Sequence, residues 1–440
     1  MVVETQVYRA VDAFSSSSAT ITVARQRQLY ASRRPTFVVM RSKKSHDDKD
    51  KPETRTVEFE LLSSIHNVTA ECWNSCLVNE TTTSKGRRTF SSPFLQHSWL
   101  AALEDSQCAC GETGWFPAHV CIRLDGDIKG FVPAYIKTHS MGEFIFDQQF
   151  AEAAYQNGIN YYPKLLVGVP FTPATGERIL FHPSVYESYS SSELKQLRQA
   201  TGKFLREISK YNQLSSVHCN FLTDQEATDL AGPLLTTTAD DDDDNRSKDS
   251  TADSIREMLM GRFQTVQDDY LRRTSLQYHW INANPKKENT PPFTDFDDYL
   301  SCFKSKRRIT IRRERSKVLE DEKIRVDAIV GKNILKYDGL VERMFEIYKS
   351  TIDKMVWGRQ YLTLDFFERL AASDFIDNLC FMCARYRKEN DDPASPTEPD
   401  DDFCADDVFA GTISKLLDRA QHLDYLRLIS HTHLVPRLDL

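Results

Sequence analysis

The sequence predicts an α/β or α+β fold in which helices cover both faces of a mixed β-sheet. Short segments with period-two apolar alternation, such as 56–62 and 217–222, recur between segments with helical spacing of apolar residues, such as 193–210. Predicted strands that alternate with predicted helices along the chain favour a fold in which helices and sheet pack in layers. A chain of 440 residues that is 40% hydrophobic can bury a core, and its length favours two globular halves.

The elements of the first half follow from these periodicities in order. A strand at 56–62 precedes two helical segments. A hairpin follows, because Asp125-Gly126-Asp127 is a tight-turn signal between two strand-like segments. A helix ends at 155–157, before Gly158. In chain order we expect helices at 65–77 and 94–105, strands at 119–124, 128–138 and 164–169, a helix at 193–210 and a strand at 217–222.

The second part of the chain carries the same two patterns. Thr363 precedes an apolar helical segment and is a suitable N-cap. We expect helices at 255–268, 296–303, 309–319, 340–351 and 364–372, and strands at 275–282, 379–386 and 408–413.

Composition divides the chain further. The first 45 residues carry eight Arg and Lys against two acidic residues, with a serine run, which is typical of a transit peptide for a plastid or mitochondrion. If this basic leader carries no targeting signal, we instead expect a cytoplasmic protein. The expected regions are a disordered leader at 1–55, a first half at 56–235, an acidic disordered insertion at 236–254, the remainder with a partial second half at 255–413, and a tail at 414–440.

Charge and cysteine usage exclude several classes. The net charge of −8 argues against a protein that coats nucleic acid, although the acids cluster at 240–244 and 391–407 and leave the remainder near neutral. The ten cysteines are scattered along the chain, with one CxxC pair at Cys380 and Cys383, and no zinc or other metal site is expected. No stretch approaches the roughly 20 apolar residues that span a bilayer.

Four segments between 91 and 178 mix aromatic residues, glycines and prolines with a few charges. They are SPFLQHSWL, ETGWFPAHV, PAYIKTHSMGEFIFD and YYPKLLVGVPFTPATGER. A sheet core needs only alternating apolar positions. Polar side chains among strand-forming residues therefore predict a surface that shapes a ligand site, with Trp115, His119, Lys137, His139, Glu143, Asp147 and Lys164 as its members.

These segments resemble the predicted N-acyltransferases labelled peptidoglycan biosynthesis or recognition proteins, a Fem-like branch of the Gcn5-related acetyltransferase (GNAT) superfamily. The resemblance continues in LQYHWIN, KRRITIRRERSKV and YLTLDFFERL, and covers about 91–413. It implies a GNAT-like mixed sheet flanked by helices and two Fem-like halves, the second incomplete.

The chain departs from the family pattern after the last predicted strand. Family members continue with a glutamate-bearing HFE segment and a GAQGEHK-like segment, whereas this sequence runs SKLLDRAQHLDYLRLISHTHLVPRLDL. We therefore expect either a shortened form of an acyltransferase or a non-catalytic binding or regulatory homologue that keeps the ligand pocket.

Acyl transfer to an amine needs a proton acceptor and a group that stabilises an oxyanion. Glu143, Asp147 and His139 are the catalytic candidates, and backbone N–H groups at 168–171 are candidate oxyanion donors. In a strand, Glu143 and Asp147 would share a face and could converge on one pocket. Alternatively, Glu143 pairs with Lys137 or Lys164 while Asp147 caps the next helix.

Candidate binding residues surround these positions. Trp115, His119 and Lys137 belong to the same segments, Lys164 could meet a carboxylate or phosphate or lie at a sheet edge, and Phe171 lies in a proline-rigid loop.

Further candidates lie later in the chain. Gln277 and His279 face one side of a predicted strand and could line the acceptor cleft. Arg308 and Arg312 belong to a basic helix that could hold the phosphates of CoA, a nucleotide sugar or RNA, or could be a solvated charged helix.

The resemblance implies acyl-CoA as donor, with aminoacyl-tRNA as the alternative. The expected acceptor is an amine-bearing small molecule or peptide. The oligomeric state is left open.

Overall fold

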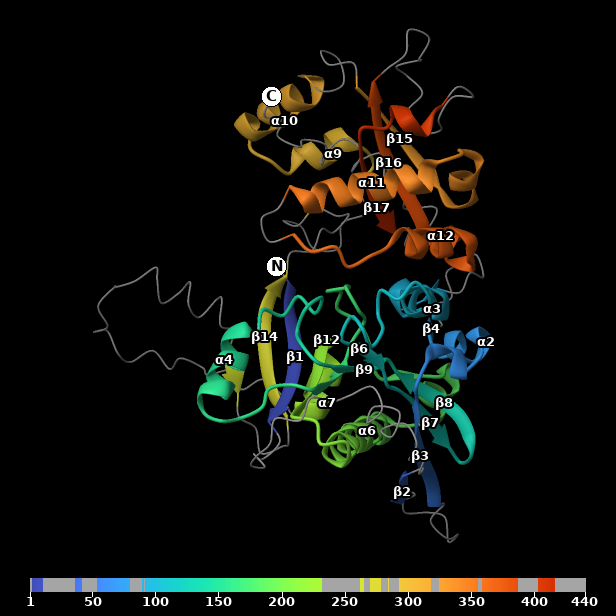
Figure 1. Cartoon of the computed structure of the whole chain (residues 1–440), viewed down its shortest axis with the longest axis vertical. Helices are drawn as coiled ribbons and strands as arrows, with labels where there is room; N and C mark the ends of the chain where they lie inside the picture. Colours follow the sequence, from blue (N-terminus) through green and yellow to red (C-terminus); the bar gives the residue numbers. More distant parts are fainter. Residues whose placement is uncertain are drawn as a thin grey trace, which may run out of the picture. The chain divides into compact units, whose positions relative to one another are not determined.

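A computed structural model of the chain divides into two compact units, Met1–Tyr278 and His279–Leu440, drawn in Figure 1. Each unit combines a β-sheet with flanking helices, so the predicted mixed α/β class is confirmed. The structure describes residues 2–10, 36–41, 54–79, 89–90, 92–231, 262–264, 270–277, 284, 293–317, 324–354, 358–386 and 403–415.

A seven-stranded mixed sheet occupies the first unit, in the order β13-β14-β1-β12-β10-β9-β6. β10 and β12 run parallel, and the other neighbours pair antiparallel. In Figure 1, β1 (blue) lies beside β14 (yellow). The strands are β1 Val2–Ala10, β6 Trp115–Pro117, β9 Ala134–Lys137, β10 Lys164–Val167, β12 Ser216–Leu222, β13 Arg262–Gln264 and β14 Leu271–Gln277.

A second sheet of the first unit is antiparallel, in the order β11-β8-β7-β3-β2. Its strands are β2 Thr36–Arg41, β3 Thr54–Leu62, β7 His119–Leu124, β8 Asp127–Val132 and β11 Leu180–Phe181, and a separate short pair joins β4 Val78–Asn79 with β5 Thr89–Phe90.

The predicted hairpin is present as β7 and β8, but the expected strand 128–138 is interrupted at Pro133. β8 belongs to the five-stranded sheet and β9 to the seven-stranded sheet. Proline has no N–H to continue a ladder, so a strand ends or changes sheet there. The Pro133 carbonyl instead accepts a hydrogen bond from Gly168 N–H at 3.1 Å. This change of sheet places Lys137 beside β10.

The helices of the first unit include one long element, α6. Ser190 and Glu193 form a capping box at its start, as expected for Ser followed three residues later by Glu. The expected helices 65–77 and 94–105 are each split into a 3-10 turn and a short α-helix. The elements are η1 Ile65–Asn67, α2 Ala70–Ser75, η2 Pro93–Leu95, α3 His97–Asp105, α4 Gln148–Gln156, α5 Pro183–Ser188, α6 Ser191–Tyr211 and α7 Asp224–Ala231.

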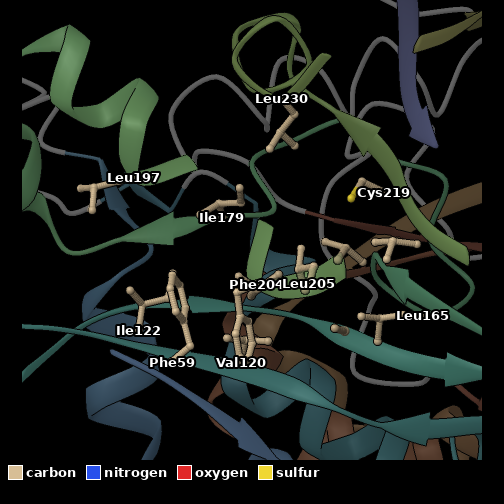
Figure 2. Close-up of a cluster of buried hydrophobic side chains, with 14 of the residues drawn as sticks. Phe59, Val120, Ile122, Leu165, Ile179, Leu197, Phe204, Leu205, Cys219 and Leu230 are labelled. Atoms are coloured by element: carbon tan, nitrogen blue, oxygen red, sulfur yellow. The ribbon is translucent and has the colours of Figure 1, made fainter. Parts of the chain in front are cut away.

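The core of the first unit lies where α6 packs against β10 and β12. Figure 2 shows Phe204 and Leu205 of α6 among the buried side chains of the strands. The Phe204 ring stacks on Phe59 with ring centroids 4.7 Å apart. Burying aromatic and aliphatic side chains removes apolar surface from water and stabilises this layer at about 25 cal/mol per Å².

The second unit contains an antiparallel sheet in the order β15-β16-β17. Thr363 caps α12 through a hydrogen bond from Phe366 N–H, as predicted. The elements are α9 Phe296–Ser301, α10 Ser305–Ser316, β15 Ile324–Val330, η4 Gly331–Lys336, α11 Leu340–Asp353, α12 Leu364–Ala372, η5 Asp374–Asn378, β16 Leu379–Tyr386, η6 Ala405–Asp407 and β17 Ala410–Lys415.

A buried ionic triad joins β15 to β16. Asp327 accepts from Arg325 Nε at 2.7 Å and from Arg385 Nε at 2.9 Å, and the Asp327 and Arg385 side chains are wholly buried. Charges removed from water are tolerated only when they are paired in this way.

The structure differs from the sequence predictions at several further places. Residues 1–55, expected to be disordered, contain β1 and β2, whose Val and Thr residues suit a pleated strand and whose ladders come from distant segments. We expected a helix at 255–268, but residues 262–264 of this range form strand β13, which pairs with β14. The prediction is wrong there. β15 was not predicted. The acidic insertion at 236–254 lies outside the described residues.

Phe204→Ala should lower the free energy of unfolding by about 3–5 kcal/mol, because it removes the stacked ring and leaves a cavity beneath the sheet. Urea denaturation would measure the change. Tyr211→Ala on the same helix is the control, since Tyr211 is exposed and its loss should change stability by less than about 0.5 kcal/mol. Equal effects of the two substitutions would contradict this account of the core.

Candidate active site

Three of the predicted site residues lie side by side across neighbouring strands. In the ladders, Lys137 of β9 is opposite Lys164 of β10 on one side and opposite Trp115 of β6 on the other. Side chains at directly opposed positions project from the same face of a sheet. All three side chains are buried. Lys164 therefore does not lie at a sheet edge, which was one of the two alternatives.

The loop after β9 brings acidic side chains to this face. The prediction that Glu143 and Asp147 lie in a strand is wrong, because Gly142, Phe144 and Phe146 have positive φ values of 78°, 57° and 51°. In this loop, residues with a left-handed backbone alternate with residues of ordinary backbone conformation, and as a result every second side chain is buried. Glu143 and Asp147 point inward, whereas Phe146 is 76% exposed. Bulky residues with positive φ carry strain, which often concentrates at functional sites.

Gly142 is required where this loop meets the next one. A Cβ at this position would lie 2.6 Å from the Phe171 ring, and its φ of 78° also favours glycine. Phe171 N–H donates to the Gly142 carbonyl at 3.2 Å. Phe171 itself packs edge-on against Trp115, with ring centroids 5.3 Å apart. The two loops are thereby joined above the sheet.

The two carboxylates converge on Lys164, as one sequence-based alternative predicted for Glu143. Lys164 Nζ lies 3.0 Å from Glu143 Oε2 and 2.8 Å from Asp147 Oδ2, and the three side chains are at most 1% exposed. These three residues are called the Lys164 cluster below. Asp147 occupies the N-cap position of α4, but its side chain makes no capping hydrogen bond. Its carboxylate serves the cluster instead.

Hydroxyl groups complete the surroundings of Asp147. Ser140 Oγ and Tyr161 Oη donate to Asp147 Oδ2 at 2.8 and 2.9 Å. Tyr162 Oη donates to Ser140 Oγ at 2.7 Å. These hydrogen bonds supplement the ion pair on one oxygen of Asp147, which favours its ionised form.

The environments of the two carboxyl groups shift their pKa values in opposite directions. Burial raises the pKa of Glu143, and the Lys164 ammonium only partly offsets this desolvation. Burial also favours neutral Asp147, but Lys164 and the hydroxyl donors together outweigh it and hold the pKa of Asp147 below its ordinary value. Acidic groups whose pKa values are pushed apart are a common arrangement in acid–base catalysis.

Lys137 is a second buried cation beside this cluster. Its Nζ lies 3.5 Å from the centroid of the Trp115 ring and donates to the Met141 carbonyl at 3.3 Å. Burial lowers the pKa of Lys137 to about 7, although Glu143 opposes the shift. Both protonation states of Lys137 are therefore populated near neutral pH.

His218 and Asn220 of β12 also belong to the site, and neither was predicted. A ring nitrogen of His218, an oxygen of Glu143 and an oxygen of Asp147 all lie within 4.8 Å of one another. Asn220 Nδ2 lies 3.5 Å from Glu143 Oε2. Burial, reinforced by the cations Lys164 and Arg273, lowers the pKa of His218 well below its ordinary value. The sequence signal was the segment SVHCNFL, in which two polar residues share one face of an apolar strand.

The Glu143, Asp147 and His218 group is of a kind that could ligate a metal ion. The Lys164 ammonium, however, already lies within 3.0 Å of both carboxylates and supplies positive charge there. A divalent cation beside it would meet strong repulsion. The donor set therefore fits an ammonium better than a metal.

Two predicted histidines have different surroundings. His119 lies away from the cluster, where Nε2 lies 3.0 Å from Glu104 Oε1 and Nδ1 accepts from Ala134 N–H at 3.2 Å. Its ring packs edge-on against Trp73 and Tyr135, as a buried structural histidine does. His139 Nδ1 accepts from Met141 N–H at 3.1 Å and so shapes the loop that carries Glu143.

Two of the candidate oxyanion donors are already engaged. The N–H groups of Gly168 and Phe171, candidate oxyanion donors, already donate to Pro133 and Gly142 carbonyls. Gln277 ends β14, but its side chain, like all of His279, lies outside the described part of the chain.

Arg308 and Arg312 lie on α10 of the second unit. Arg308 Nη1 donates to the Phe303 carbonyl at 3.1 Å, and Arg312 pairs with Asp297 at 2.7 Å. α10 buries no residue.

Together, the fold and the site define the chain as a mixed α/β protein with a buried cluster of ionisable side chains. A family profile matches residues 64–394, and the chain belongs to this family, the FemAB-like family, which is described as peptidoglycan biosynthesis/recognition. No curated protein matches the chain, and no solved structure does. Among the described residues, no helix is long and apolar enough to cross a membrane.

The lowered pKa of Lys137 should make stability depend on pH. Between about pH 7 and pH 10.5 the unfolded chain keeps a proton that folded Lys137 has lost, so the free energy of unfolding should rise with pH in this window. Lys137→Met should remove a slope of up to about 1.4 kcal/mol per pH unit. Denaturant titrations at intervals from pH 6.5 to 10 would measure it.

Lys195→Met, at an exposed position of α6, is the matched control and should parallel the unsubstituted protein across this pH range. If the Lys137→Met curve also runs parallel, Lys137 does not titrate as its surroundings indicate.

Proposed function

We propose that this protein is an N-acyltransferase whose acceptor amine reacts at the Lys164 cluster. The observation that carries the proposal is the pair of buried carboxyl groups with oppositely shifted pKa values that share one lysine. Membership of the FemAB-like family supports a role in peptidoglycan-related transfer or recognition. The transferred group is an acyl or aminoacyl group.

Glu143 is the proposed proton acceptor. The amine nitrogen attacks the carbonyl carbon of the donor ester or thioester, and the new C–N bond forms as the proton leaves the nitrogen. The raised pKa of Glu143 makes this carboxylate a stronger base than an ordinary one. When the C–S or C–O bond of the donor breaks, Glu143 returns this proton to the departing group.

Asp147 and the lysines have supporting roles in this proposal. Asp147 remains ionised and holds Lys164, which positions Glu143 in turn. Lys137 makes no ion pair among the described residues and lies over Trp115, so its protonated form can stabilise the oxyanion of the tetrahedral intermediate. His139 fixes the intervening loop through Met141.

The donor and acceptor follow from the family resemblance. Acyl-CoA is the proposed donor, with aminoacyl-tRNA as the alternative. The acceptor is an amine on a small molecule or a peptide, and the family description favours a peptide.

Glu143→Gln should reduce turnover by roughly 10²- to 10⁴-fold, since it removes the proton acceptor but keeps the side-chain shape. An amine-acceptor screen with acetyl-CoA and longer acyl-CoAs would measure turnover, and calorimetry would measure donor binding. Donor affinity should remain micromolar. The turnover of the unsubstituted protein should rise with pH as Glu143 loses its proton.

The control is His119→Gln, which alters a buried histidine outside the cluster. Both variants need a thermal-unfolding check of folding. Unchanged turnover in folded Glu143→Gln would refute the role of Glu143. Failure of the folded, unsubstituted protein to bind acyl-CoA would favour an aminoacyl-tRNA donor or a non-catalytic binding protein.

A further inference from the structure

We infer that helix α10 is a docking surface for membranes of anionic phospholipid, in which Ile309 enters the lipid layer while Lys306 and Arg313 bind lipid phosphate groups. These three residues are called the α10 face below. The inference goes beyond the proposed function, because α10 belongs to the second unit and the proposed transfer mechanism uses none of its residues.

The first observation is the burial of α10. The helix spans Ser305–Ser316, and none of its residues is buried. Contacts hold it on one side, where Arg312 Nη2 pairs with Asp297 at 2.7 Å and the Arg315 guanidinium lies 4.4 Å from the centroid of the Phe296 ring. A helix that buries no residue gains little from packing within its own unit. Its exposed side is therefore available to a partner.

The second observation is the arrangement of the α10 face. Residues three and four apart are neighbours on a helix surface, so Ile309 lies between Lys306 and Arg313. All three side chains are exposed, and Ile309 is 62% exposed. Helices that lie in the membrane interface bury apolar side chains below the phosphate groups. The long stems of lysine and arginine let their charges remain at the level of these groups.

The third observation is the charge of the helix. α10 carries six lysine and arginine residues against one acidic residue, Glu314. Neither Lys306 nor Arg313 forms an ion pair with another described residue, whereas Arg312 pairs with Asp297. Near an anionic lipid surface, each additional cation strengthens binding roughly fivefold. The charge of the α10 face is thus complementary to such a surface.

RNA is the other polyanion that this charge would attract. Proteins commonly bind single-stranded RNA by stacking its bases on aromatic side chains. α10 contains no aromatic residue, and the centre of its exposed face is the aliphatic side chain of Ile309. An aliphatic side chain gains from leaving water for lipid but gains little beside a phosphate backbone. The α10 face therefore fits an anionic membrane better than RNA.

Sedimentation of the full chain with lipid vesicles would test the inference. The protein should bind vesicles of equal parts phosphatidylglycerol and phosphatidylcholine roughly tenfold more tightly, or better, than vesicles of phosphatidylcholine alone. Added salt should weaken this binding, because it screens the charges. Equal binding to both kinds of vesicle, or no binding to either at low ionic strength, would overturn the inference.

Ile309→Ser tests the apolar contact. It should weaken binding to the phosphatidylglycerol vesicles about tenfold, since serine gains nothing from entering lipid. Leu335→Ser is the matched control, because Leu335 lies on η4 of the same unit, is 58% exposed and should not contribute. Unchanged binding of Ile309→Ser, or an equal loss in the control, would overturn the inference.

Lys306→Gln combined with Arg313→Gln tests the charge. The double variant should bind the phosphatidylglycerol vesicles roughly 25-fold more weakly, about fivefold for each lost cation. Lys332→Gln combined with Lys349→Gln removes the same charge from exposed positions of η4 and α11 and should bind normally. If the two double variants bind equally, net charge alone explains the binding and α10 is not the docking surface.

Polyuridylate distinguishes RNA from lipid as the occupant. It should not displace the protein from phosphatidylglycerol vesicles. Displacement by polyuridylate, together with polyuridylate binding that Ile309→Ser leaves unchanged, would overturn the inference in favour of an RNA surface. Thermal unfolding would confirm that each variant is folded, which is expected because none of the substituted side chains is buried.

Discussion

The interaction on which the site depends is the charge compensation of Lys164. This ammonium is wholly buried, and removing a charge from water is tolerated only when opposite charges lie close to it. Two carboxylates from one loop must therefore turn inward. This requirement accounts for the unusual backbone of the loop, in which residues of positive φ alternate with Glu143, Ile145 and Asp147. The strain at Phe144 and Phe146 is offset by the ion pairs that the loop completes.

The sheet topology supplies the other half of the site. Because Pro133 ends β8 and lets β9 enter the seven-stranded sheet, Lys137 comes to lie opposite Lys164, and the loop after β9 begins beside β10. The parallel pairing of β10 with β12 brings His218 and Asn220 to the same cluster. One proline and one parallel pairing thus join segments that are more than 70 residues apart.

The dependence of the site on a buried charge and on the sheet topology explains which features could be predicted from the sequence. The helix at α6 and the hairpin of β7 and β8 follow from local patterns. The contact of Lys164 with a carboxylate was one of two alternatives that the sequence left open. The conformation of the 142–147 loop could not be predicted, because it is imposed by a buried charge rather than by the residues' own preferences. His218 and Asn220 gave only the weak signal of two polar residues in a strand, since their role depends on a neighbouring strand. β15 could have been predicted, because its sequence shows clear alternation. β1 could not, because its pairing requires distant segments of the chain.

The unequal surroundings of Glu143 and Asp147 give the two carboxyl groups different acid–base properties. Both carboxylates contact the same ammonium, but three donors meet at Asp147 Oδ2, whereas Glu143 Oε2 has Lys164 and a distant Asn220 amide. Hydrogen bonds to an ionised carboxylate favour its charged form, so Asp147 keeps its charge while burial makes Glu143 the more basic group. A single lysine does not satisfy both carboxylates equally. Among the described residues, the hydrogen-bonding capacity that Lys164 leaves unsatisfied lies on Glu143 Oε1 and Asp147 Oδ1.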